Sequence, residues 1–330
     1  MAYYLITGGC GFIGAHLARD LLEDGHFVRV LDNLSMGNME TLNKDYDLVV
    51  GDVRDSSLVR QCMTGMDGCF HLAAVASAKK FTGDSISMHQ TNLSGSINVL
   101  DAACGENTPV VYASSSAVYG DNAEPLLKEQ DRLRPLTAYG ADKVGCELHA
   151  RVAALAHDLP TIGLRFFNVY GPRQSPTLPH SGVVSVFIDR LLRGKAVHTY
   201  GDGEQIRDFI YVVDAVRFLR KAMEKVGSGP TIYNVCSGES VSINQLAKSA
   251  MSILNINLPI AHRPCRKGDT RGFVGDPSLA GQYLQVSTRY RLAEGLYKYI
   301  KHEQEINRII NHFDNAGSDA FPGLLLSVNG

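Results

Sequence analysis

The sequence predicts an α/β protein built on a doubly wound parallel sheet, followed by a smaller α/β domain toward the C-terminus. A glycine-rich loop, TGGCGFIG at residues 7–14, lies between a short apolar run and an amphipathic run. Apolar runs of strand length then alternate with helical runs through the first half of the chain, which is the pattern of a parallel sheet covered by helices on both faces. After about residue 174 the alternation weakens, and this change predicts the second domain.

The composition excludes several classes of function. The chain has 330 residues, 45% of them hydrophobic and 20% charged, which is ordinary for a globular protein with a sizeable core. A net charge of -2 argues against a nucleic-acid binder, which needs a basic surface. Seven cysteines without a CxxC pair predict reduced thiols and no metal site. With no signal peptide and no apolar run long enough for a bilayer, we expect a soluble cytoplasmic protein that binds no membrane.

The first strand, Tyr3–Ile6, and the loop after it predict a dinucleotide site. Glycines let the backbone approach a pyrophosphate, and the following helix offers free N–H groups at its N-terminus. The second strand, residues 27–31, ends in Asp32, at the offset of about 20 residues expected for a carboxylate on the adenosine ribose. Because Asp32 repels a 2′-phosphate, the sequence favours NAD over NADP.

The next two strands continue the cofactor site. Strand 47–50 leads to Asp52, which either accepts a hydrogen bond from the adenine amino group or caps a turn. Strand 68–72 runs into Ala73-Ala74, and these small residues leave room for a flat cofactor. His71 lies inside this apolar run, so we expect a satisfied core histidine and not a catalyst.

The middle of the chain predicts the catalytic end of the sheet. Residues 86–104 fit one long helix, and residues 110–113 form a strand that ends in Ser114–Ser116. A helix follows at 138–157, and a strand at 161–166. Ligands of such sheets bind where the strands end.

The last part of the chain predicts the second domain. We expect a helix at 183–193, the last strand of the main sheet at 232–235, and helices at 243–254 and 292–303. The predicted NAD-binding domain comprises residues 1–173 and about 207–237, the predicted substrate domain comprises about 174–206 and 238–310, and residues 311–330 form a poorly ordered tail.

Tyr139 and Lys143 carry the predicted chemistry. They lie four residues apart, on one face of helix 138–157. A phenol is a poor base at its usual pKa near 10, but a neighbouring ammonium and a positively charged nicotinamide ring both favour the phenolate. The phenolate can take a proton from a hydroxyl as hydride leaves the same carbon. Ser115 or Ser116 could hydrogen-bond that oxygen. A Tyr/Lys pair alone is often a surface pair, but the glycine loop and the serines favour catalysis.

Together these motifs resemble the extended short-chain dehydrogenase/reductases with a Rossmann sheet, and specifically the UDP-sugar 4-epimerases of the UDP-glucose 4-epimerase type. The resemblance runs from the glycine loop to about His302. The pieces that match are Thr7–Gly14, Asp32–Leu34, Gly51–Val53, His71–Ala74, Tyr112–Gly120, Tyr139–Lys143, Leu164–Arg173, Arg207–Asp214 and Arg266–Asp269.

The resemblance implies a catalytic triad of Ser115, Tyr139 and Lys143, with Ser116 as the alternative serine. Lys143 would also bind the nicotinamide ribose. The cofactor-binding residues that it implies are Gly8, Gly11, Phe12, Ile13, Gly14, Asp32, Asn33, Ser35, Gly37, Asp52, Val53, Leu72, Ala73, Ala74, Asn92, Tyr139, Lys143, Phe166 and Val169. The implied substrate-binding residues are Ser115, Ser116, Asn168, Arg207, Arg266, Asp269 and Phe273.

The implied reaction is NAD-dependent epimerisation of a nucleotide-diphosphate sugar, most simply a UDP-sugar, at carbon 4. Tyr139 removes the hydroxyl proton, hydride passes to NAD, and the 4-keto sugar turns before hydride returns to its other face. Arg207 and Arg266 would hold the diphosphate, with Asp269 on the uridine ribose. Phe273 would narrow the sugar pocket and favour plain hexoses over N-acetylhexosamines.

Several alternatives are weighed against this reaction. Relatives that are 4,6-dehydratases are expected to have Asp and Glu where this chain has Ser116 and Ala117, and UDP-glucuronate decarboxylases are expected to have Glu in place of Ala117. A 4-ketoreductase would more often use NADP, which Asp32 disfavours, and a catalytically silent NAD sensor would usually lack the Tyr/Lys pair. Epimerases of UDP-glucuronate or UDP-N-acetylhexosamines stay open. The family usually forms homodimers through the helices that carry Asn92 and Tyr139, and we expect Val99, Leu100 and Leu148 on the outer face.

Overall fold

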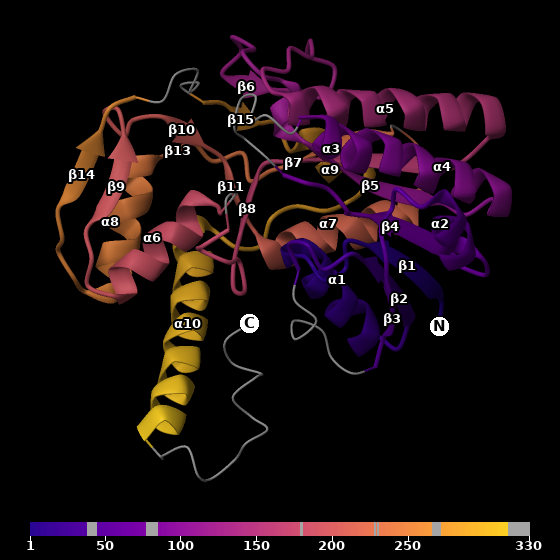
Figure 1. The fold of residues 1–330 in the computed structure, drawn as a ribbon. Coiled ribbons are helices and arrows are strands. Elements are labelled where there is room, and N and C mark those ends of the chain that lie inside the picture. The colour runs from indigo at the N-terminus through magenta and orange to yellow at the C-terminus, as the bar shows by residue number, and fades with distance from the viewer. Residues whose placement is uncertain are drawn as a thin grey trace.

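A computed structural model describes residues 1–37, 45–76, 85–178, 181–227, 229, 231–265 and 272–315. Among these residues, no helix is both long enough and apolar enough to cross a bilayer. The N-terminal two thirds of the chain surround one large sheet, and a smaller group of helices and strands lies to its left in Figure 1.

The main sheet has seven strands, all parallel, in the order β12-β7-β5-β4-β1-β2-β3. The strand order reverses between β1 and β4, and in such sheets the ligand crevice lies at that reversal, beyond the carboxyl ends of the strands. This topology confirms the predicted fold class. The strands are β1 Tyr3–Thr7, β2 Phe27–Asp32, β3 Asp47–Val50, β4 Gly68–His71, β5 Val110–Ser115, β7 Thr161–Phe166 and β12 Ile232–Val235.

Helices cover both faces of the sheet, which explains why its strands read as continuous apolar runs. Leu5 and Ile6 are neighbours on β1, and they point into two different cores. The core of Ile6 includes α1 and α7, and the core of Leu5 includes α2, α4 and α5 (Figure 1). These helices are α1 Phe12–Glu23, α2 Ser56–Met63, α4 Gly95–Glu106, α5 Ala138–His157 and α7 Val212–Lys225.

The helix expected at 86–104 is interrupted. It consists of α3 Ser85–His89, a π-helical turn at Gln90–Ser94, and α4. Asn92 lies in the π turn and is buried, and its side-chain amide bonds both the N–H and the carbonyl of Val75, at 2.7 and 3.1 Å. The widened turn thus turns Asn92 inward toward the strand end after β4. Turns of this kind are frequent at functional sites.

Two residues expected on the outer face of these helices are in the core. Val99 and Leu100 are only 0% and 5% exposed, because α4 packs between α2 and α5 and both lie against the sheet. The expectation for Leu148 is confirmed, since its side chain on α5 is 59% exposed.

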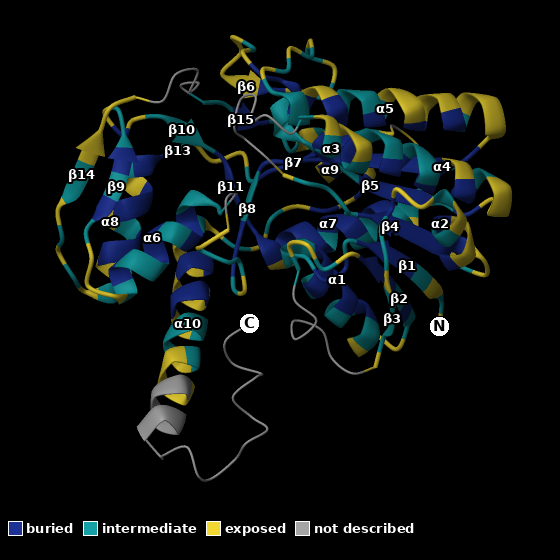
Figure 2. Ribbon diagram, in the orientation of Figure 1, coloured by how far each residue is buried: buried dark blue, intermediate teal, exposed yellow. Residues whose placement is uncertain are grey.

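The smaller region has its own core, which includes Phe187, Leu246 and Leu296. It comprises α6 Val183–Leu192, α8 Ile243–Leu254 and α10 Leu292–Asn315, with β9 Val197–Tyr200 paired to β14 Ile260–Arg263. The helix expected at 292–303 extends to Asn315 because Ile306 and Ile309 continue its apolar spacing. Leu296 and Ile300 near its start are buried in the core of the smaller region, and residues 307–309 are exposed (Figure 2). Residues 316–330 lie outside the described residues.

Short strand pairs connect the two regions. The pairs are β8 Asn168–Tyr170 with β11 Phe209–Tyr211, β10 Ile206–Arg207 with β13 Val241–Ser242, and β6 Leu126–Leu127 with β15 Val274–Gly275. Helix α9, Ser278–Tyr283, packs beside β12.

Candidate active site

The glycine loop packs closely against neighbouring backbone at Gly8 and Gly14, whereas there is more space beside Gly11. Gly8 has a φ of +72°, and a Cβ there would lie 2.7 Å from the Ala73 backbone. A Cβ on Gly14 would lie 2.3 Å from the Gly8 carbonyl oxygen, whereas one on Gly11 would meet only that oxygen, at 3.2 Å. Helix α1 begins after Gly11 with no side-chain cap. Its first N–H groups are therefore available to an anionic group beside Gly11.

Asp32 is held at the end of β2 by backbone donors. One carboxylate oxygen accepts from Cys10 N at 2.9 Å, and the other from Leu34 N at 2.8 Å. Each oxygen keeps a further acceptor position, which two ribose hydroxyls can use. The geometry therefore suits the predicted contact of Asp32 with an adenosine ribose.

A solvent-open cavity of about 520 Å³ connects the loop to the ends of β2 and β4. The sequence did not identify Met36, Val75 and Thr91 as lining residues, because nothing in their type marks a ligand contact. The predicted residues that line the cavity are Gly8, Gly11, Asp32, Asn33, Ser35, Gly37, Val53, Leu72, Ala73 and Ala74. The open glycine, the uncapped helix and the carboxylate at one cavity fit the phosphates and adenosine of NAD.

Asp52 has partners within the protein. Its carboxylate accepts from Arg54 N at 2.9 Å, from the Arg54 guanidinium, and from Asn33 Nδ2 at 2.8 Å. Partial burial acts to raise the pKa of Asp52, but the hydrogen bonds from Arg54 and Asn33 together outweigh it and hold that pKa below its usual value. The turn-capping alternative thus describes this side chain in the structure. Arg54 follows two residues later, and the sequence prediction did not include it.

Four other predicted cofactor residues do not line this cavity. Phe12 begins α1 and faces the ring of His16, with the ring centroids 5.6 Å apart. Ile13, Phe166 and Val169 pack on the core that faces α1 and α7.

Helix α5 places Tyr139 and Lys143 at the end of β5. Lys143 is buried, its Nζ donates to the carbonyl of Ala113 at 2.7 Å, and it lies 5.7 Å from the centroid of the Tyr139 ring. Thr137 caps the helix by accepting from Gly140 N at 3.0 Å. A Cβ on Gly140 would lie 2.7 Å from Ala117 O, so the first turn of α5 packs directly on the segment after the serines.

Ser115 ends β5 with its hydroxyl in a defined role. Its Oγ accepts from Ala117 N at 3.2 Å and so caps the 3₁₀ turn Ser116–Val118. With an acceptor position occupied, the hydroxyl proton remains available for an oxygen on a ligand. Ser116 lies in the turn itself. The structure therefore brings both candidate serines and the Tyr139–Lys143 pair to the same end of the sheet.

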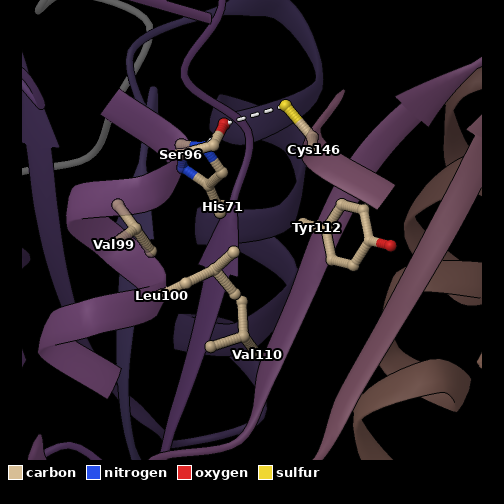
Figure 3. A pocket seen from close by; sticks show the side chains of 7 residues that line it. All are labelled: His71, Ser96, Val99, Leu100, Val110, Tyr112 and Cys146. Atoms are coloured by element: carbon tan, nitrogen blue, oxygen red, sulfur yellow. Dashed lines mark hydrogen bonds between the residues drawn. The ribbon is translucent and has the colours of Figure 1, made fainter. Parts of the chain in front are cut away.

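His71 is a satisfied core histidine, as the sequence predicts. Its ring nitrogens lie 2.7 Å from Thr7 Oγ1 and 2.8 Å from Ser96 Oγ. Figure 3 shows His71 and Ser96 beside a small internal void, with Cys146 Sγ bonded to Ser96 Oγ at 3.2 Å. This void lies between the sheet and α4, and its lining is otherwise apolar or aromatic, so it is not the candidate ligand site.

Two of the predicted substrate residues, Asn168 and Arg207, lie on the short strands that join the two regions. Asn168 donates its backbone N–H and one side-chain N–H to the carbonyl of Asp208, at 3.0 and 2.9 Å. Arg207, on β10, donates to Ile206 O at 2.7 Å. The intervening Asp208 is fully buried, and the sequence prediction did not include it. Its carboxylate accepts from Ser237 N, Ser237 Oγ, Gly238 N and Gly275 N.

Phe273 packs against an aromatic cluster next to the serine turn. Its ring lies edge-on to Tyr119 and Phe167, with centroids 6.4 and 6.2 Å away. The two other predicted substrate residues, Arg266 and Asp269, lie outside the described residues.

Comparisons with known proteins identify the family. The model of the NAD dependent epimerase/dehydratase family matches residues 4–236. A UDP-N-acetyl-alpha-D-glucosaminuronate decarboxylase from Bacillus cytotoxicus is 35% identical over 286 residues, 83% of this chain and 87% of its own length. A UDP-glucose 4-epimerase from Thermotoga maritima, solved with UDP-glucose, aligns with a TM-score of 0.88 at 33% identity, over 92% of this chain and 99% of that chain. A UDP-glucose 4-epimerase from Thermus thermophilus, solved with NAD, gives 0.84 at 32% identity over the same shares.

Proposed function

The chain belongs to the NAD dependent epimerase/dehydratase family, and we propose that it is a UDP-hexose 4-epimerase with NAD as its cofactor. The observation that carries the proposal is the site at the end of β5. Lys143 lies 5.7 Å from the Tyr139 ring and bonds the carbonyl of Ala113, two residues before Ser115, and the two residues after Ser115 are Ser116 and Ala117. Elimination of water needs an acid beside the reacting sugar, and the chain offers none at these two positions.

The residues have distinct roles in this proposal. Tyr139 takes the proton from the carbon-4 hydroxyl and later returns it. The buried Lys143 ammonium favours the phenolate form of Tyr139. Ser115 donates its hydroxyl proton to the same sugar oxygen, and this bond strengthens as that oxygen gains carbonyl character. Bound NAD supplies the acceptor and donor of hydride.

The sugar nucleotide is held on the other side of the site. Arg207 and Asn168 lie on β10 and β8, which join the two regions, and we assign them to the diphosphate. A guanidinium suits this task because it binds phosphate oxygens in a fork. Residues 174–206 and 238–310 form the substrate-binding domain in this proposal. In this proposal the sugar is held more loosely than the diphosphate, so that it can turn between the two hydride transfers.

A UDP-uronate decarboxylase is the second candidate. The relative from Bacillus cytotoxicus, at 35% identity, favours it. Both reactions begin with oxidation at carbon 4, so the same Tyr139 serves either. The absence of an acid at Ser116 and Ala117 supports the epimerase.

We also propose that the enzyme is a homodimer that pairs through α5. Leu148, Val152 and Leu155 form a stripe on the outer side of this helix, and they are 59%, 58% and 73% exposed. A continuous apolar stripe on a long surface helix is typical of an interaction face. Gel filtration showing only monomer at micromolar concentration contradicts this part of the proposal.

The test is incubation with UDP-glucose, UDP-galactose, UDP-N-acetylglucosamine and UDP-glucuronate without added NAD, followed by proton NMR of the anomeric region. We expect UDP-glucose and UDP-galactose to interconvert. Tyr139→Phe keeps the ring and removes the proton carrier, so we expect turnover to fall by about 10³-fold. Release of CO₂ from UDP-glucuronate without interconversion of the hexoses supports the decarboxylase. A requirement for stoichiometric NAD(P)H identifies a ketoreductase.

A further inference from the structure

Helix α5 continues its catalytic face one turn beyond Lys143, at Glu147. This carboxylate is buried and has three side-chain donors. Its Oε1 accepts from Ser114 Oγ at 2.5 Å and from Arg165 Nε at 2.8 Å, and its Oε2 accepts from Arg165 NH2 at 2.7 Å. The side chains of Arg165 and Glu147 are only 4% and 9% exposed. The two charges are therefore almost completely removed from water.

Arg165 is fixed on its other side as well. Its NH1 donates to Tyr119 Oη at 3.0 Å and to the carbonyl of Glu129 at 2.9 Å. Tyr119 in turn donates to Asn234 Oδ1 at 2.6 Å. Arg165 thus makes four hydrogen bonds, two to Glu147 and two to Tyr119 and Glu129, and together these hold its guanidinium in one orientation.

These residues connect β5, β7 and α5 at the end of the sheet where Ser115 and the Tyr139–Lys143 pair lie. Ser114 directly precedes Ser115 on β5. Arg165 lies opposite Ser114 on the neighbouring strand β7. Glu147 follows Tyr139 and Lys143 along α5. The bond from Lys143 Nζ to Ala113 O is the adjacent connection between the same helix and the same strand.

Stability alone does not require such a group. Replacing a buried ion pair by apolar residues of similar volume is often neutral or stabilising, because taking two charges out of water costs about as much as their attraction returns. Apolar packing does not fix the orientation of one element relative to another. The bidentate Arg165–Glu147 pair, with Ser114 as a further donor, fixes both the distance and the rotation of α5 relative to β5.

We propose that Ser114, Glu147 and Arg165 are positioning residues that hold the Tyr139–Lys143 pair in register with Ser115. The inference rests on the proposed function, since it concerns the geometry of that reaction. Proton and hydride transfer need the reacting groups in near-attack geometry, and a displacement of about 1 Å can cost on the order of 100-fold in rate. The diphosphate-binding residues lie on other elements, so losing this register lowers kcat and leaves KM for the sugar nucleotide nearly unchanged.

Ser114→Ala is the most selective test, because it removes one hydrogen bond and leaves the ion pair in place. Thr108→Val is the matched control. Thr108 is equally buried, lies just before the other end of β5, and makes one side-chain bond, to Met66 O at 3.3 Å. We expect kcat to fall about 10-fold in Ser114→Ala, with KM within about twofold, and both values unchanged in Thr108→Val. Equal kcat values in the two variants at similar Tm would overturn the proposal.

A second readout does not depend on turnover. Lys143 Nζ lies 5.7 Å from the centroid of the Tyr139 ring in the wild-type structure. In crystal structures of Ser114→Ala and Glu147→Gln we expect the Tyr139–Lys143 pair to be displaced by about 1 Å relative to Ser115. A variant that is only less stable keeps the wild-type placement, and this result contradicts the positioning role. If the wild-type protein turned over none of the sugars, the proposed function would fail, and these structures would still decide the positioning role.

Discussion

The cofactor side and the sugar side of the site are built in different ways. The cofactor side uses backbone groups and short side chains from the first 76 residues, attached directly to the ends of β1, β2 and β4. The proposed sugar side uses the side chains of Asn168, Arg207 and Phe273, which lie on separate short strands or beside them. Cofactor geometry is therefore set by the sheet itself, whereas sugar geometry depends on how distant segments are joined.

Asp208 connects the segments of the sugar side. Its carboxylate accepts hydrogen bonds from Ser237, Gly238 and Gly275, and its backbone carbonyl accepts one from Asn168. Burial raises the pKa of Asp208, and these hydrogen bonds act in the opposite direction. Segment 272–275 contacts the rest of the protein through the bond of Gly275 N to Asp208 and through the packing of the Phe273 ring on Phe167 and Tyr119, and none of these contacts involves the glycine loop.

The strongest prediction for the cofactor side concerns Gly8. Gly8→Ala places a Cβ 2.7 Å from the Ala73 backbone at a φ of +72°, so we expect the free energy of unfolding to fall by about 3 kcal/mol and the purified protein to lose its NAD. Urea denaturation and the NAD content of a heat-released supernatant measure the two effects.

Gly25→Ala is the control for Gly8→Ala. Gly25 has a φ of +77° with no atom within 4 Å of the added Cβ, so it carries the same backbone strain without the clash. We expect a loss of about 1 kcal/mol with NAD retained. Equal losses in both variants contradict the role of the Gly8–Ala73 contact.

The difference between local sequence patterns and contacts between distant elements explains what could be predicted from the sequence. The glycine loop, Asp32 and the Tyr139–Lys143 pair are local patterns, and the strands between them are apolar runs in chain order. The π turn around Asn92 and the Glu147–Arg165 pair depend on packing between elements. Glu147 does carry a local signal, because it lies four residues after Lys143 on the same helical face. Asp208 carries none, since its partners lie 29 or more residues away along the chain.

A second prediction for the cofactor side concerns pH. Burial, and then the charge of Lys143, lower the pKa of His71 to about 3. His71 is therefore neutral in the folded protein, whereas in the unfolded chain it binds a proton below about pH 6.5. Its contribution to stability is complete above that pH and is lost progressively toward pH 3. Between pH 7 and pH 5 we expect protonation of His71 in the unfolded chain to lower the free energy of unfolding by about 2 kcal/mol.

His71→Asn tests this contribution, because asparagine does not titrate in this range. The variant loses stability at pH 7, since bonds to Thr7 and Ser96 are weakened, but we expect its further loss between pH 7 and pH 5 to be smaller by about 2 kcal/mol than that of the wild-type protein. Urea denaturation at the two pH values measures both. Parallel losses in the two proteins show that His71 does not govern the acid sensitivity.

The smallest expected effect is on the sugar side, at Phe273. Its ring lies edge-on to Tyr119 and Phe167 beside the serine turn, so Phe273→Ser opens space there without touching the cofactor side. We expect the ratio of UDP-N-acetylglucosamine to UDP-glucose turnover to rise about 10-fold, since an added group in a pocket changes discrimination by about 1–3 kcal/mol. Phe273→Leu keeps most of the apolar volume, and we expect its ratio to stay near that of the wild-type protein. NAD content should be unchanged in both variants, because Asp208 and the residues bonded to it separate segment 272–275 from the glycine loop. An unchanged ratio in Phe273→Ser would assign the control of sugar size to another segment, whereas loss of NAD in that variant would show that the two sides are not independent.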